Sequence, residues 1–267
     1  IMRVSWKNQG TYPDATSANK YCNTAQEWCW QTILFGGLRD GGKSYYSLNI
    51  SNIGKSLATA AANVKVRWEY ADGNTADVID PVLANTWSLP FVEEVLWKPE
   101  GAENLDTKLI LVFGGGKSET RTSYEGSWLY ILDADSISPT TQMPIAAPIH
   151  RFLVPSVNQK CDIAPTKLLT EENYGNSCDV TNQADYNQVP SDPLLLDVNN
   201  DQFPDFIYFG DEEGRVWKAV IHDPDPKKWG LCLFFDTGDK GYDDLAHVTT
   251  ACNGDLRQYR SASQQPD

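Results

Sequence analysis

The stretch LILVFGGGKSETRTSYEGSWLYILDA, residues 109–134, is the clearest copy of a unit that recurs along the chain. An apolar segment runs into a glycine-containing turn, and a second segment rich in Tyr, Trp and Leu follows. The same order occurs in WQTILFGGLRDGGKSYYSLNI (30–50) and in DFIYFGDEEGRVWKAVI (205–221). Short apolar and aromatic runs separated by glycine turns are typical of antiparallel β-hairpins. The sequence therefore predicts three related hairpins.

Further parts of the unit also recur. SLPFVEEV, from Ser88, and SDPLLLDV, from Ser191, each place a Ser-x-Pro ahead of a short apolar strand. Proline fits at the first position of a strand, because no N–H is needed there. A later strand returns as VKVRWEYA (64–71) and KWGLCLFF (228–235). Units of three or four antiparallel strands at a long period indicate an all-β fold, a β-propeller with quinoprotein-like blades.

The whole chain, residues 1–267, is interpreted as one propeller domain or a segment of one. About three blade units are recognisable, at approximately 22–80, 81–137 and 188–250. Residues 138–187 carry Pro, Asn and Asp clusters and are expected to form an irregular insertion. Because propellers close with about four to eight blades, either a fourth blade is hidden in 135–190 or the chain is part of a larger ring. We favour the larger ring.

Residues Gly37–Ser44 match the phosphate-loop pattern G-x-x-x-x-G-K-[ST]. A phosphate loop must lead into a helix, whose N-terminal N–H groups hold the phosphates. Ser44 is instead followed by YYSLNIS, which favours a strand. We therefore expect these glycines to serve a hairpin turn and not a nucleotide.

The stretch LLLDVNNDQFPDFIYFGD (194–211) carries oxygen ligands at alternate positions. They are the side chains of Asp197, Asn199, Asp201 and Asp205 and the backbone carbonyl of Phe203. This alternation is the ligand order of an EF-hand-like calcium loop, and it predicts a structural Ca²⁺ site.

Two residues depart from an EF-hand. Tyr208 replaces the usual bidentate Glu, and Gln202 replaces the usual Gly of the sharp turn, while the flanks are predicted strands. The alternative is an Asx-rich hairpin turn that binds no metal.

This D-x-N-x-D-x-x-x-D-x-x-Y-x-G-D loop, followed by EGRVWKAVI, resembles the C-terminal β-propeller of the PilC/PilY family of type IV pilus tip-associated proteins and adhesins. The Gly-Gly hairpin ILFGGLRDGGKSYYSLNI and the Ser-x-Pro strand starts are also similar. The resemblance covers most of 30–100 and 109–135 and all of 190–240. It implies calcium binding by the five residues named above. It also implies export through the periplasm to the pilus tip or outer cell surface, contact with minor pilins or the tip complex and with a surface receptor, and roles in pilus biogenesis, adhesion and motility.

Composition narrows the class of partner and the compartment. A formal net charge of −14 and a pI near 4.6 argue against nucleic acid, and the longest apolar run, LILVF, is too short to span a membrane. The order of the six cysteines suggests three local loops, Cys22–Cys29, Cys161–Cys178 and Cys232–Cys252, which we interpret as disulfides of an oxidising compartment. The alternative is buried free thiols in a cytoplasmic protein.

The sequence favours a non-enzymatic role. None of the three histidines, His150, His222 and His247, neighbours a candidate nucleophile in a recognisable pattern. Two alternatives stay open: a quinoprotein dehydrogenase-like propeller enzyme and a generic extracellular binding propeller, for instance an integrin-like one. The quinoprotein enzymes resemble this chain only in the strand-and-turn pattern of their blades. They typically carry a vicinal Cys-Cys pair beside the quinone, and this chain has none.

Overall fold

A computed structural model describes eight parts of the chain, in which residues 2–7 and 28–31 are described by their backbone alone. The parts are residues 2–7, 28–50, 64–71, 83–98, 103–119, 125–136, 146–154 and 186–236.

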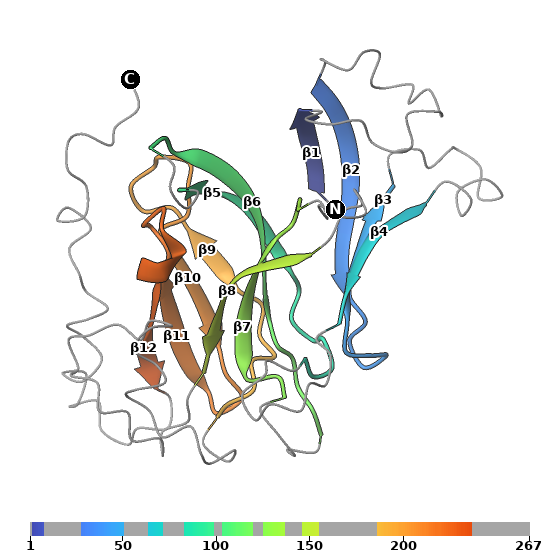
Figure 1. Ribbon diagram of the computed structural model, residues 1–267. Helices are drawn as coiled ribbons and strands as arrows, with labels where there is room; N and C mark the ends of the chain where they lie inside the picture. The colour runs from blue at the N-terminus through green and yellow to red at the C-terminus, as the bar shows by residue number, and fades with distance from the viewer. Residues whose placement is uncertain are drawn as a thin grey trace.

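Three four-stranded sheets make up the described part of the fold, and they lie side by side with the second in the middle (Figure 1). The first sheet contains β1 (Met2–Lys7), β2 (Trp28–Gly37), β3 (Tyr45–Asn49) and β4 (Lys65–Tyr70). The second contains β5 (Phe91–Trp97), β6 (Asp106–Gly114), β7 (Trp128–Asp133) and β8 (Ala147–Leu153). The third contains β9 (Leu194–Leu196), β10 (Phe206–Gly210), β11 (Arg215–Val220) and β12 (Gly230–Asp236). A 3₁₀ turn, η2 (Pro226–Lys228), precedes β12.

Each sheet is an antiparallel meander of four consecutive strands. The three predicted hairpins are β2–β3, β6–β7 and β10–β11. The predicted fold class is therefore confirmed: the described residues are all-β, and their three sheets fit a partial β-propeller.

The edge strand β8 differs from the sequence expectation. Residues 138–187 are predicted to be an irregular insertion, yet Ala147–Leu153 pair along β7 and complete the second blade. Pro148 makes this segment look like a loop in the sequence. On an edge strand, however, a residue without an N–H costs no ladder hydrogen bond. The strand β1 likewise begins before the predicted first unit at residue 22.

The third and fourth strands of every blade are offset by a bulge. The register shifts lie between Ser47 and Leu48, between Ile131 and Leu132, and between Val216 and Trp217. A bulge increases the local twist of a strand pair, so the same device shapes the outer edge of all three blades.

The second sheet is buried on both faces. Ile110 and Val112 of β6 pack toward the third sheet, where Ile207 and Trp217 belong to the same cluster. The alternate residues of β6 join a second cluster with Tyr45 and Trp68 of the first sheet; they are Leu109, Leu111 and Phe113. Burial on both faces explains the continuous apolar run LILVF. Each such side chain contributes about 1.5–3 kcal/mol when it is fully buried.

The phosphate-loop match is a hairpin turn, as the sequence predicts. Ser44 leads into strand β3, and the turn closes through the Gly41 N–H, which donates to the Leu38 carbonyl at 2.9 Å. A Cβ on Gly37 would lie 2.7 Å from Thr86 Oγ1, so glycine is required by a neighbouring segment.

No helix long and apolar enough to cross a bilayer occurs in the parts of the chain that the structure describes.

Candidate metal-binding loop and the linkers between blades

The predicted calcium loop, residues 197–205, joins the neighbouring antiparallel strands β9 and β10. Its two ends are tied to the sheet. The Asp205 N–H donates to the Leu196 carbonyl at 2.8 Å, and the Ile221 N–H donates to the Asp205 carbonyl at 2.9 Å. The loop therefore starts and ends on a rigid frame.

The Asp197 carboxylate organises the first half of this loop. One oxygen accepts N–H groups from Asn200 at 2.7 Å and from Asp201 at 3.3 Å. The other accepts the N–H of Gln202 at 2.8 Å. Three consecutive amides thus point at one carboxylate, which wraps the backbone around it.

Asp205 holds the second half and is buried, with 1% of its surface exposed. Its Oδ2 accepts the N–H of Val198 at 2.9 Å and that of Asn199 at 3.3 Å, and its Oδ1 accepts Asn199 Nδ2 at 2.7 Å. Asn199 Oδ1 accepts the Asp201 N–H at 2.9 Å, and Asp201 Oδ1 accepts the Phe203 N–H at 3.0 Å. All four predicted side-chain ligands therefore belong to one hydrogen-bonded loop.

Two residues of the loop have positive φ, namely Asn200 at 59° and Gln202 at 77°. Asn adopts this region readily, but a longer side chain does so at a cost of about 1 kcal/mol. Gln202 is the position at which the sequence pattern expects Gly. The backbone makes the sharp bend there without glycine.

The donor chemistry of the loop fits a hard cation. It offers carboxylate and amide oxygens on alternate residues, and an oxygen that accepts one N–H keeps a further lone pair. In the conformation described, these oxygens are bonded to the loop's own amides. Within the described residues, no three Asp, Glu, His or Cys side chains form a group spaced to hold a metal. Calcium binding therefore stays a prediction.

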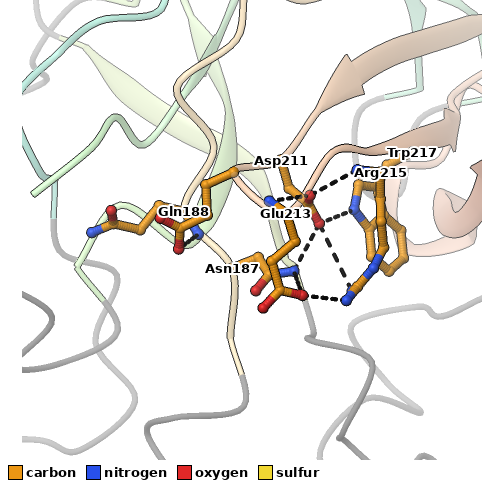
Figure 2. Close-up of polar contacts among 7 residues, drawn as sticks. Asn187, Gln188, Asp211, Glu213, Arg215 and Trp217 are labelled. Atoms are coloured by element: carbon orange, nitrogen blue, oxygen red, sulfur yellow. Dashed lines mark hydrogen bonds and ion pairs between the residues drawn. The ribbon is translucent and has the colours of Figure 1, made fainter. Parts of the chain in front are cut away.

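A second polar cluster, which the sequence analysis does not single out, lies at the β10–β11 turn (Figure 2). Asp211 Oδ1 accepts the N–H groups of Glu213 and Arg215, both at 3.0 Å. Its Oδ2 accepts Asn187 Nδ2 at 2.8 Å and Trp217 Nε1 at 2.9 Å. One buried carboxylate thus joins the turn, the blade core and the segment that enters the blade.

The guanidinium group of Arg215 completes this cluster. Its Nη1 lies 3.9 Å from Asp211 Oδ2, and its Nη2 pairs with the Glu213 carboxylate. The Arg215 side chain is only 3% exposed. A buried cation of this kind needs its carboxylate partners, so the cluster is expected to stabilise the turn.

Two linkers connect consecutive blades: the first linker is residues 83–90 and the second linker is residues 186–193. Ser88 Oγ of the first accepts the N–H of Gly114 at 2.9 Å. Ser191 Oγ of the second accepts the N–H of Gly210 at 2.7 Å and donates to its carbonyl at 2.8 Å. The repeated Ser-x-Pro and the repeated glycine are therefore two halves of one contact, in which a serine pairs with the end of its own blade's second strand.

The linkers also cross the hairpin of the preceding blade. The N–H of Thr86 donates to the Gly42 carbonyl at 3.3 Å, and the N–H of Val189 donates to the Gly126 carbonyl at 2.9 Å. Each linker therefore ties one blade to the next at the same end of the sheets.

The same linkers accept hydrogen bonds from the hairpin of their own blade. The Asn85 carbonyl accepts the Lys117 N–H, and the Gln188 carbonyl accepts the Glu212 N–H, both at 3.0 Å. Gln188 also contributes its side chain, because its Nε2 donates to the Glu125 carbonyl of the preceding blade at 3.1 Å.

The one histidine with a buried side chain in the described residues is a core residue. His150 is 4% exposed and lies edge-on to Phe152 and Trp229, with ring centroids 4.4 and 5.8 Å apart. Burial lowers the pKa of this imidazole to about 4, with a smaller contribution from Arg151. His222 follows β11, and His247 lies outside the described residues.

Of the six cysteines, the structure describes the side chain of Cys232 alone, on β12. The predicted pairs Cys22–Cys29, Cys161–Cys178 and Cys232–Cys252 each include a residue outside that description and stay predictions.

Three consecutive four-stranded meanders, joined by linkers with one repeated contact pattern, define the class: this is a partial β-propeller. No family model matches the sequence. Over 189 residues the chain is 24% identical to the type IV pilus biogenesis factor PilY1 of Pseudomonas aeruginosa, in strain PAO1 and in strain PAK. The chain is thus similar to a protein of the PilC/PilY family, the family that its calcium-loop motif resembles.

The match spans 71% of this chain but 11% of the length of PilY1. The crystal structure of the P. aeruginosa PilY1 C-terminal domain is similar with a TM-score of 0.43 and 20% identity, over 76% of this chain and 32% of that one.

Proposed function

We propose that this chain is the propeller part of a type IV pilus biogenesis protein, and that its 197–205 loop binds a structural calcium ion. The observation that carries the pilus assignment is the match over 71% of the chain to a protein named as a type IV pilus biogenesis factor. In this proposal the protein is exported, works at the pilus tip or outer surface with minor pilins, supports adhesion and motility, and is not an enzyme.

The calcium part of the proposal is supported by the loop geometry. Asp197, Asp201 and Asp205 place three carboxylates within nine consecutive residues of a tied loop. A divalent cation would offset their mutual repulsion and would replace the hydrogen bond from Asn199 to Asp205. The ion would then hold the β9–β10 corner in one conformation.

Calcium binding can be measured on the chain by titration calorimetry, with a matched pair of variants. Asp201→Asn keeps an oxygen that can accept the Phe203 N–H, so the loop can still form. Losing one carboxylate should weaken binding by roughly tenfold or more. Asp40→Asn makes the same charge change on an exposed turn of the first blade and should bind like the wild type. Absence of binding heat in the wild type, or equal affinities for the two variants, would show that the loop is not a calcium site.

The pilus role is tested separately, in cells that lack the full-length gene. Surface pili, attachment and twitching should fall in the deletion strain and return with the wild-type gene. A gene carrying Asp201→Asn should restore them poorly, whereas one carrying Asp40→Asn should restore them fully. Normal piliation and motility in the deletion strain would refute the pilus role, whatever the calorimetry shows.

A further inference from the structure

The Asn199 side chain is bonded at both of its ends within the 197–205 loop. Its Nδ2 donates to Asp205 Oδ1 at 2.7 Å, and its Oδ1 accepts the N–H of Asp201 at 2.9 Å. These two partners fix the orientation of the amide group, because an ionised carboxylate only accepts hydrogen bonds and a backbone N–H only donates them. The nitrogen of the Asn199 side chain, and not its oxygen, therefore faces Asp205.

This orientation is the opposite of the one that a cation requires. A calcium ligand at Asn199 must offer its side-chain oxygen. The amide nitrogen is a hydrogen-bond donor and offers nothing to a cation. In the orientation described, the Asn199 side chain therefore competes with a cation for Asp205 Oδ1.

The Asp205 carboxylate is also held by contacts that do not involve the Asn199 side chain. Its Oδ2 accepts the backbone N–H groups of Val198 at 2.9 Å and of Asn199 at 3.3 Å. The Asp205 backbone is tied to Leu196 and Ile221. Asp205 is 1% exposed, and a carboxylate buried to this extent is costly unless it is bonded. The Asn199 Nδ2 group supplies such a bond to Oδ1.

The N–H of Asp201 has a second acceptor. It donates to Asp197 Oδ1 at 3.3 Å as well as to Asn199 Oδ1. If the Asn199 amide group turns by half a turn about its last side-chain bond, this N–H keeps Asp197 as its acceptor, and the Asn199 oxygen comes to face Asp205. The backbone bonds to Asp197 and Asp205 do not depend on that rotation. One side-chain rotation therefore replaces a donor by an acceptor and leaves the loop in shape.

We propose that Asn199 is a latch that sets the affinity of the loop for calcium: its amide donates to Asp205 when no ion is bound, and it turns its oxygen inward to ligate calcium. This inference rests on the calcium site proposed above. Asparagine suits both roles, because one rotatable group carries a donor and an acceptor, whereas aspartate only accepts. The latch keeps the loop closed at low calcium. It also weakens calcium binding, because its bond to Asp205 must break first.

The variant Asn199→Asp separates the two roles, because a carboxylate can ligate the ion but cannot donate to Asp205. Titration calorimetry should show calcium binding at least ~10-fold tighter than in the wild type. Asn200→Asp is the matched control. It makes the same charge change on the adjacent exposed residue, and aspartate tolerates the positive φ of 59° found there. This control should tighten binding by no more than ~3-fold, because the exposed charge is screened.

Hydrogen exchange in the presence of a calcium chelator tests the latch without the ion. The amides of Val198 and Asn199 donate to Asp205, so their exchange reports whether its carboxylate stays in place. After correction for the intrinsic rates of each sequence, Asn199→Asp should speed their exchange by at least ~10-fold, and Asn200→Asp should change it by no more than ~3-fold. Peptides from β6 and β7 report whether the rest of the fold is intact.

The two measurements distinguish failure of the latch from failure of the calcium site. Equal exchange of the two variants in the chelator, or equal calcium affinities, would overturn the latch while calcium binding by the wild type still stands. Absence of binding heat in the wild type would refute the calcium site and the latch together.

Discussion

Replacing Asp211 with alanine should destabilise the protein strongly, because this carboxylate is the common acceptor of the β10–β11 turn. It accepts two backbone N–H groups and the side chains of Asn187 and Trp217, at 2.8 to 3.0 Å. Asn187 is fully buried and Trp217 is 4% exposed, so water cannot replace the lost acceptor for these two donors without opening the core.

The size of the effect follows from these donors. Leaving a buried donor without a partner costs about 1–3 kcal/mol, and removing one partner of a buried ion pair costs about 3–5 kcal/mol. The Glu213 amide belongs to an exposed residue and can be hydrated, so it adds little, whereas the Arg215 amide is buried and counts with the other two donors. Because neighbouring losses do not add, Asp211→Ala should lower the free energy of unfolding by roughly 3–5 kcal/mol. A typical domain has about 5–15 kcal/mol in total.

Urea denaturation followed by circular dichroism measures this loss. Asp40→Ala, on an exposed turn, is the control and should change stability by no more than about 0.5 kcal/mol. Trp217→Phe keeps a ring in the core but removes the indole donor. It should cost about 1 kcal/mol in the wild type and almost nothing when combined with Asp211→Ala. A loss below about 1 kcal/mol for Asp211→Ala, or an equal cost of Trp217→Phe in both backgrounds, would refute the reasoning.

Burial depresses the His150 pKa from 6.5 to about 4, so stability is complete above pH 6.5 and is lost as the pH falls toward 4, by at most roughly 3 kcal/mol. His150→Gln should abolish this loss in melting curves recorded across that range, and an unchanged pH profile would contradict it. Burial raises the pKa of the Asp135 carboxyl from 3.8 to about 7, although Arg67 Nη2 lies 3.2 Å from its Oδ1. The stability that Asp135 contributes therefore changes with pH in the opposite direction to that of His150. It is present below pH 3.8 and lost as the pH rises through 7, and Asp135→Asn should remove that decline. Gly114→Ala would place a Cβ 2.2 Å from the Val189 carbonyl oxygen and should cost about 2 kcal/mol or more by thermal melting. Gly210→Ala, whose nearest neighbour is 3.6 Å away, should cost less, and equal losses would count against the clash.

The hairpins and the fold class could be predicted from the sequence because both depend on local patterns. Glycines at turns and runs such as LILVF specify strands through neighbouring residues alone. The strand β8 could not be predicted in this way. Its Pro148 favours a loop, and only the pairing of this edge with β7 makes it a strand.

The same distinction between local patterns and long-range contacts applies to the candidate site. The 197–205 loop is visible in the sequence because its donors alternate within one short stretch. The Asp211 cluster is not visible in the sequence, because Asn187 contacts Asp211 from a different segment of the chain. No local spacing of residues predicts that contact. The repeated Ser-x-Pro is visible as a motif, but its purpose becomes clear only when Ser88 is seen to meet Gly114.

The meander order of the strands bears on how the chain can fold progressively from its N-terminal side. Each sheet uses four successive strands, so a blade has all its partners as soon as its own residues are free to pair. Local pairings form fast, because little chain entropy is lost in closing short loops. Blades can therefore fold one after another in sequence order, and each linker then aligns the newest blade on its finished predecessor.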